Sequence, residues 1–425
     1  MDAETLLMGP RGRRLLLCFV TSWPDEQDRT DPELDAALNV ADEALDVDGS
    51  YGPLQMAVAV GSAGYDHDEL MRELELARKE RAEKIKAAKA EPGPLLESIA
   101  AGLARTPLPP PTVSALMQAL EDSVSTARYW QHPDGLDVAL ADPRVKDALL
   151  RVAQHVLPAC DWMERPIDRD QSWAVRDGAP VEVTYEDHEA ETENIEVAGD
   201  YGDPAALQEE FLKNWKFMPL PTTGDDATSE FDDDDPEVGW CTPMGDGTVT
   251  TGLSPDPDRP GPLQLYCEED DYGPEDRRAT RVVVSDSDRV LEICSGQDWA
   301  DLCAEFPRDI TRNAREWSES TGRHPRSPGD GTDPGWVTPD IAAASRHYDG
   351  IHLTIAAYLA CSGTAIPVPP SNGRENGASM IAGWHPDATV WLSDRTSAKT
   401  VRWLWRDEDD WPVYRYELDP ASVSA

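Results

Sequence analysis

Hydrophobic positions in the first third of the chain recur at helical spacing. The segment 68–89 has no Pro or Gly, is rich in strong helix formers and carries a thin stripe of apolar residues, so it predicts a long solvated helix. Thr112 is a suitable N-cap for a second helix running through Val124. A third helix is expected after Pro143, because Val145, Leu149, Val152 and Val156 share one face.

Short apolar runs interrupt this helical pattern. Leu15–Val20 predicts a buried strand, and Leu54–Val60 is a second run of strand length. We therefore expect residues 1–160 to form an α-rich domain with a few strands. Residues 161–280 are acidic and loop-rich with short strands, of which Val181–Tyr185 is one.

Strands and helices alternate after residue 281. Ser295 or the Gln297-Asp298 pair is expected to cap one helix, Pro339 to open another, and Ile355–Cys361 to form a third. Strands are predicted at 282–284, 290–293, 351–354, 364–368, 380–384 and 389–393, the last two as neighbours in one sheet, with a closing hairpin from 401–405 and 413–417. The predicted fold class is α+β, with an α-rich amino-terminal domain, an acidic middle segment and a tryptophan-rich α+β domain at 281–425.

Charge, cysteine content and hydropathy indicate which partners and which cellular location to expect. The chain has 82 acidic and 38 basic residues, a formal net charge of −44, so it repels polyanions and nucleic acid is not expected as a partner. The 7 cysteines include no CxxC pair, which is typical of reduced thiols and a cytoplasmic location. No run approaches the ~18 apolar residues of a membrane span.

The least ordinary chemistry lies between residues 336 and 394, which hold three tryptophans and three histidines. No nucleotide-binding or zinc motif is present, and His347 and His352 have no evident third ligand, so no metal is expected. His352 and Thr354 alternate along a predicted strand and would project into one cleft. The alternative interpretation of His352 is a hydrogen-bonded core histidine.

At this point the order of elements resembles the RNA 2′-phosphotransferases and the ADP-ribosyltransferase fold. The resemblance covers residues 289–395 and is carried by His352-Leu353-Thr354, by Gly363 with Ala365-Ile366-Pro367-Val368, and by Val390-Trp391-Leu392-Ser393-Asp394. It implies NAD as the cofactor, with His352 and Thr354 contacting the dinucleotide. It also implies that Asp387 lies near the position where transferases of this fold place a catalytic acid, and a carboxylate there would offset the charge of an oxocarbenium-like transition state. The Ala, Asp, Arg and Pro bias resembles actinobacterial proteins.

Two functions of different class follow from these observations. The first is NAD-dependent ADP-ribosyl transfer by the carboxy-terminal domain, with His352 and Asp387 as catalytic residues and Thr354 as a cofactor-binding residue. The alternative is a non-enzymatic acidic scaffold or inhibitor that binds a basic partner protein.

Overall fold

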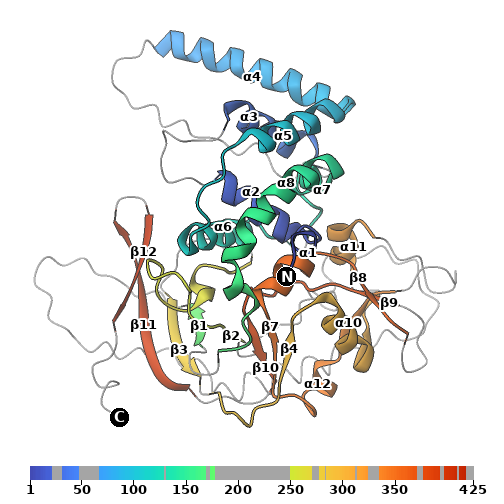
Figure 1. The fold of residues 1–425 in the computed structure, drawn as a ribbon, viewed down its shortest axis with the longest axis vertical. Coiled ribbons are helices and arrows are strands. Elements are labelled where there is room, and N and C mark those ends of the chain that lie inside the picture. The colour runs from blue at the N-terminus through green and yellow to red at the C-terminus, as the bar shows by residue number, and fades with distance from the viewer. Residues whose placement is uncertain are drawn as a thin grey trace, which may run out of the picture.

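The computed structural model describes residues 1–21, 31–46, 67–128, 131–168, 173–177, 249–269, 277–282, 284–311, 314–323, 335–370, 377–392, 397–408 and 411–417. The fold is α+β, as the sequence predicts, with most of the helices of the first 160 residues gathered at one end and the sheets, together with later helices, at the other (Figure 1). No helix within these ranges is long and apolar enough to cross a membrane. The expected strands Leu54–Val60 and Val181–Tyr185 and most of the acidic middle segment lie outside the described residues.

Helices make up the amino-terminal part of the structure. They are α1 (Ala3–Leu6), α2 (Pro10–Thr21), α3 (Pro32–Ala44), α4 (His67–Ala90), α5 (Gly93–Arg105), α6 (Val113–Ser125), α7 (Gly135–Ala141) and α8 (Pro143–Val156), followed by the short 3-10 helices η2 (Leu157–Ala159) and η3 (Asp161–Glu164). Side chains satisfy the first amides of several of them: Thr112 accepts from the Ala115 amide at α6, and Asp142 accepts from the Arg144 amide at α8. The three helices predicted from periodicity, α4, α6 and α8, are confirmed.

The predicted strand at Leu15–Val20 is wrong, because this run is the second half of helix α2. Pro10 stands at the first position of the helix, where its missing amide costs nothing, and the polar residues 11–14 form the first turns. Almost every residue of α2 is buried between neighbouring helices. A helix that is buried on all sides can carry a continuous run of apolar residues. Here that run is no longer than a strand, which is why the sequence pattern was misinterpreted.

A four-stranded sheet organises the carboxy-terminal part. Its order is β2 (Val249–Thr250), β10 (Thr389–Trp391), β7 (Gly350–Leu353) and β4 (Val290–Ile293). Strands β4 and β7 are parallel, whereas β10 is antiparallel to both of its neighbours. Helix α10 (Gly296–Glu305) follows β4, and helix α13 (Ile355–Cys361) follows β7. Both helices begin where the sequence predicts.

The remaining elements form smaller sheets and connecting helices. A second four-stranded sheet has the order β1 (Trp173–Asp177), β3 (Arg277–Val282), β11 (Ser397–Glu408), β12 (Trp411–Glu417), and the pairing of β11 with β12 confirms the predicted hairpin. Strands β5 (Pro307–Asp309) and β6 (Val337–Pro339) form one pair, strands β8 (Ile366–Val368) and β9 (Gly377–Ser379) form another, and α11 (Arg315–Thr321), α12 (Ile341–Ala344) and η4 (Leu263–Leu265) complete the order.

Three further predictions in this part need correction. Pro339 ends strand β6, and it is Asp340 that caps α12 by accepting the Ala343 amide, so the helix starts later and is shorter than expected. The strand predicted at 282–284 ends at Val282, where β3 pairs with β1 and β11. Residues 380–384 form no strand, since the chain turns there through Gly383 at φ 63, and β9 pairs with β8 rather than with β10.

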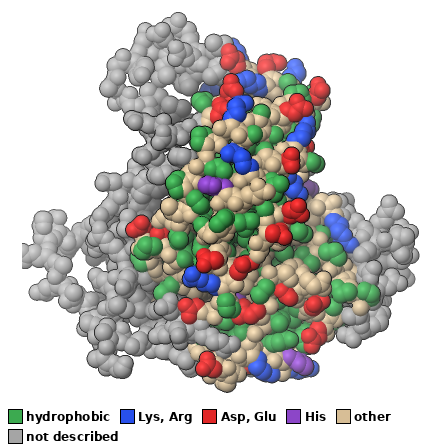
Figure 2. Space-filling view, viewed as in Figure 1, with side chains coloured by type: hydrophobic (Ala, Val, Ile, Leu, Met, Phe, Trp, Pro, Cys, Tyr) green, Lys and Arg blue, Asp and Glu red, His purple; other side chains and the backbone are tan. Residues whose placement is uncertain are grey.

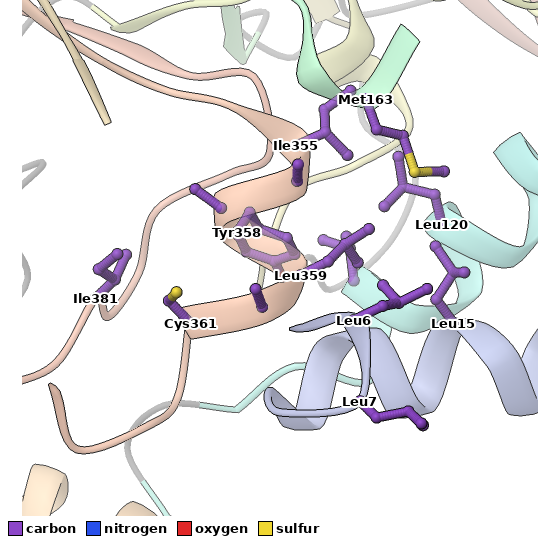
Figure 3. Close-up of a cluster of buried hydrophobic side chains, with 14 of the residues drawn as sticks. Leu6, Leu7, Leu15, Leu120, Met163, Ile355, Tyr358, Leu359, Cys361 and Ile381 are labelled. Carbon is purple, nitrogen blue, oxygen red and sulfur yellow. The ribbon is translucent and has the colours of Figure 1, made fainter. Parts of the chain in front are cut away.

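One hydrophobic core joins the two parts. Figure 3 shows Ile355, Tyr358 and Leu359 of α13 facing Leu6, Leu15, Leu120 and Met163 of the amino-terminal helices. These side chains are all less than 5% exposed. The helical layer and the sheet therefore form one packed body across this contact, although the sequence places them in separate domains.

Candidate functional site

A row of polar side chains crosses the sheet β2-β10-β7-β4 on one face. His352 of β7 is opposite Glu292 of β4 and opposite Thr389 of β10, and Thr389 is in turn opposite Thr250 of β2. Residues in register on neighbouring strands share a face of the sheet, so these four stand side by side. The alternating residues Leu291, Ile351, Leu353 and Val390 belong to the hydrophobic core.

His352 is the buried centre of this row. Its side chain is 1% exposed, and its Nδ1 lies 2.9 Å from the hydroxyl oxygen of Thr389. Its Nε2 lies 3.7 Å from Glu292 Oε2 and 3.7 Å from Asp387 Oδ1, beyond hydrogen-bond distance, and has no hydrogen-bond partner among the residues that the structure describes. Burial lowers the pKa of His352 to about 3, so the imidazole is neutral at physiological pH.

Asp387 approaches His352 from the turn that precedes β10. It is the one non-glycine residue with positive φ in the described part of the chain, at 61°, a conformation that Asp tolerates better than most residues. The Gly252 amide donates to Asp387 Oδ2 at 2.7 Å. A Cβ at position 252 would lie 2.9 Å from the same oxygen, so glycine permits this close approach.

The surroundings of Asp387 favour its protonated form. Burial raises the pKa of Asp387 to about 7, the Asp168 and Glu292 carboxylates add to the rise, and the Gly252 amide partly offsets it. The carboxyl group therefore changes charge near neutral pH, next to an imidazole that does not. Groups with such displaced pKa values are enriched at functional sites.

One residue of this cluster, Glu292, was missed in the sequence. Glu292 lies within the apolar strand Val290–Ile293, and a lone carboxylate in such a strand is the signal that could have identified it. The Ile167 amide donates to Glu292 Oε1 at 3.2 Å, so the segment after η3 passes over the carboxylate. We name Glu292, His352 and Asp387 the sheet cluster.

Thr354 has a different environment from His352. It follows the end of β7 and caps α13: its hydroxyl accepts from the Ala357 amide at 3.2 Å and donates to the Ile293 carbonyl at 3.3 Å. Thr354 lines a cavity of about 680 Å³, which neither His352 nor Asp387 lines. The two residues expected to face one cleft therefore do not share a cavity in the described structure, while His352 and Asp387, 35 positions apart, are brought together.

This cavity opens at the carboxyl ends of the parallel strands β4 and β7, where ligands of α/β sheets commonly bind. Cys294, which follows β4 directly and comes two residues after Glu292, lines it. The remaining lining comes from the chain around α1, from α8, η3, α10 and α13, and from β8 with the residues that precede it. We name this space the interlayer cavity, because it lies between the helical layer and the sheet.

Other titratable groups provide less chemistry. His385 accepts from the Glu269 amide at 3.2 Å, and His347 packs against the Phe306 ring. Burial raises the pKa of the Cys361 thiol to about 11, so it is a neutral thiol and not a nucleophile. No group of three His, Cys, Asp or Glu residues within the described ranges is arranged to hold a metal ion.

The tryptophans of this region are buried. Trp336, Trp384 and Trp391 are each 1% exposed or less, and the Trp391 indole donates to the Thr250 hydroxyl at 2.9 Å. This hydrogen bond holds Thr250 at the end of the polar row that is farthest from Glu292.

On the face shown in Figure 2, the Lys and Arg side chains of the described residues are interspersed with Asp and Glu and form no continuous basic patch.

Comparisons of the chain with protein-family models, with curated proteins and with solved structures find no match. The resemblance to RNA 2′-phosphotransferases and ADP-ribosyltransferases accordingly stays a prediction.

Proposed function

We propose that the sheet cluster is the acid–base site of an enzyme that cleaves a glycosidic bond, and that its substrate is NAD. One observation carries the proposal: a neutral buried imidazole and a carboxyl group that titrates near pH 7 face each other with Nε2 left without a hydrogen bond. Structural polar clusters are normally satisfied, because an unsatisfied buried polar atom costs about 1–3 kcal/mol. A ligand atom placed in this gap would recover that cost.

The pair of carboxylates supports glycosyl chemistry in particular. Enzymes that cleave glycosidic bonds use two carboxyl groups in different environments, one of which has a raised pKa. Glu292 and Asp387 flank His352 in this way, and their side chains are 28% and 16% exposed. The two acidic side chains are therefore partly exposed, while the imidazole stays buried.

The proposed step follows from these positions. The bond between ribose C1′ and the nicotinamide nitrogen breaks, and nicotinamide leaves with the bonding electrons. The Glu292 carboxylate offsets the positive charge that develops on the ribose. An acceptor hydroxyl adds to C1′ and transfers its proton to the Asp387 carboxylate, whose pKa near 7 suits a general base at neutral pH. His352 keeps the gap polar and accepts or donates one hydrogen bond through Nε2.

The test is release of nicotinamide from NAD by the purified full chain, followed by chromatography. Asp387→Asn keeps the size and the backbone preference of the residue but removes the base, so turnover should fall by about 10²-fold or more. His352→Gln should also lower turnover. Asp286→Asn is the matched control, because Asp286 lies exposed in the turn before β4 and should leave turnover unchanged.

Two outcomes would overturn the proposal. One is full activity in Asp387→Asn. The other is no nicotinamide release by folded wild-type protein, which together with co-purification of a basic protein favours the acidic binding protein expected as the alternative.

A further inference from the structure

The interlayer cavity is lined mainly by apolar groups. Its walls include the side chains of Met8, Ala300, Ala356, Ala360 and Ile366. Met8 is 65% exposed, one of the few large hydrophobic side chains in the described structure that solvent reaches, and it stands on the rim. A cavity of about 680 Å³ is within the size range of sites for small organic ligands.

The two thiols of the lining do not add charge. Burial raises the pKa of Cys294 and the pKa of Cys361, so both are neutral and behave as small apolar groups. Cys361 also receives the Gly296 amide at the start of α10, while Ser295 and Asp298 satisfy each other and the neighbouring amides. The first turn of α10 is therefore already capped by the protein itself.

The charged groups of the lining leave one cation in excess. The amino group of Met1 forms an ion pair with Glu164, so these two charges balance. Lys146 of α8 also lines the cavity, and no acidic side chain among the described residues lies within ion-pair distance of it. In a chain with a net charge of −44, most lysines are expected to have an acidic neighbour, so a lysine without one beside an apolar cavity is unusual.

We propose that the interlayer cavity binds an amphipathic monoanion, an aliphatic chain with a terminal carboxylate that rests on Lys146. The apolar walls would cover the chain, and the single excess cation matches a single negative charge. A ligand with two or more phosphates would lack partners, because the lining supplies no second lysine or arginine. The inference does not depend on glycosidic chemistry at the sheet cluster.

The experiment is calorimetric titration of the full chain with octanoate and, as the uncharged probe, octan-1-ol. Octanoate should bind about ten-fold more tightly than octan-1-ol, since a hydrogen bond to a charged partner contributes roughly that factor. Lys146→Gln should weaken octanoate binding about ten-fold and leave octan-1-ol binding unchanged. Lys86→Gln is the matched control, because Lys86 is exposed on α4 and outside the cavity.

A second variant locates the binding site. Thr5 lines the cavity and is only partly buried, so Thr5→Trp can fill the space without disturbing the core. It should abolish binding of both probes. Equal affinity of wild type for the two probes, unchanged octanoate binding in Lys146→Gln, unchanged binding in Thr5→Trp, or no binding by wild type would each overturn the proposal.

Discussion

Each of the two parts of the molecule holds a buried basic side chain between two acidic ones, Arg14 in the helical layer and His352 in the sheet, and the two arrangements differ. In the helical layer Arg14 of α2 lies 2.6 Å from an oxygen of Asp134 and 2.9 Å from an oxygen of Asp137. In the sheet His352 lies 3.7 Å from an oxygen of each of its two carboxylates. The Arg14 cluster is closed by hydrogen bonds, whereas the sheet cluster is open at its centre.

This difference separates a structural site from a candidate functional one. Burial lowers the pKa of Arg14, but the Asp137 and Asp134 carboxylates outweigh it and raise the pKa overall, so the guanidinium keeps its charge. In the sheet cluster the charges are suppressed, because burial lowers the pKa of His352 and raises that of Asp387. A cluster that forms charged hydrogen bonds stabilises the fold. A cluster whose buried groups are held in their neutral forms contains groups that can exchange a proton.

The largest effect on stability is expected where the charges are kept. Arg14→Met removes the ion-pair partner of Asp134 and leaves the buried Asp137 with only the more distant Arg11, 3.9 Å away, so it should lower the free energy of unfolding by about 3 kcal/mol. His352→Leu should lower the free energy of unfolding by only about 1 kcal/mol. Asp387, with a pKa of about 7, can be protonated in the variant and then leaves no charge next to the leucine. Urea denaturation at pH 7 measures both. Equal losses for the two variants would remove the distinction between the clusters.

A smaller effect, with a definite pH dependence, is expected for Asp387→Asn. The folded pKa of Asp387, about 7, lies above its ordinary value of 3.8, so its contribution to stability is present below pH 3.8 and is lost as the pH rises through 7. The asparagine variant carries no buried charge. It should therefore be more stable than wild type at pH 8, by on the order of 2 kcal/mol, and lose this advantage near pH 4.

Thermal denaturation of both proteins from pH 4 to pH 8 tests this expectation. Asp286→Asn serves again as the control, since an exposed carboxylate gives no such pH dependence. A variant that gains stability at pH 8 and loses turnover would show a site kept at some cost to the fold. A constant difference across the pH range would mean that Asp387 is not forced toward its protonated form.

The fold could be predicted wherever a local signal decides it. Thr112 and Ser295 cap helices through their own side chains, so their positions are visible in the sequence. Leu15–Val20 failed because its burial on all sides depends on α6 and α13, which are distant in the chain. The predicted boundary at residue 160 assigns α2 and α13 to different domains, although the two helices share one core. Contacts between α2 and α13 leave no local pattern in the sequence, so the shared core could not be predicted.

The candidate site was predictable only in part for the same reason. His352 and Asp387 were selected from a resemblance, and the structure brings them together, although their chemical roles stay a prediction. Glu292 joins them only because β4 pairs with β7 in the register that sets Glu292 opposite His352. The Gly252 amide reaches Asp387 across 135 positions of sequence. Pairing register and such long-range contacts are set by tertiary packing, which no spacing rule shows.

The smallest effect concerns the side-chain hydrogen bond between His352 and Thr389. Thr389→Val preserves the shape of the side chain but leaves His352 Nδ1 without its partner, so it should lower the free energy of unfolding by about 1 kcal/mol. When His352→Leu is added, both polar groups are gone and the space is apolar. The double variant should then be more stable than the sum of the two single losses predicts, by about 1 kcal/mol, in a double-mutant cycle measured with urea. Strict additivity would mean that Thr389 does not hold the imidazole, and the orientation of Nε2 toward the two carboxylates would need another cause.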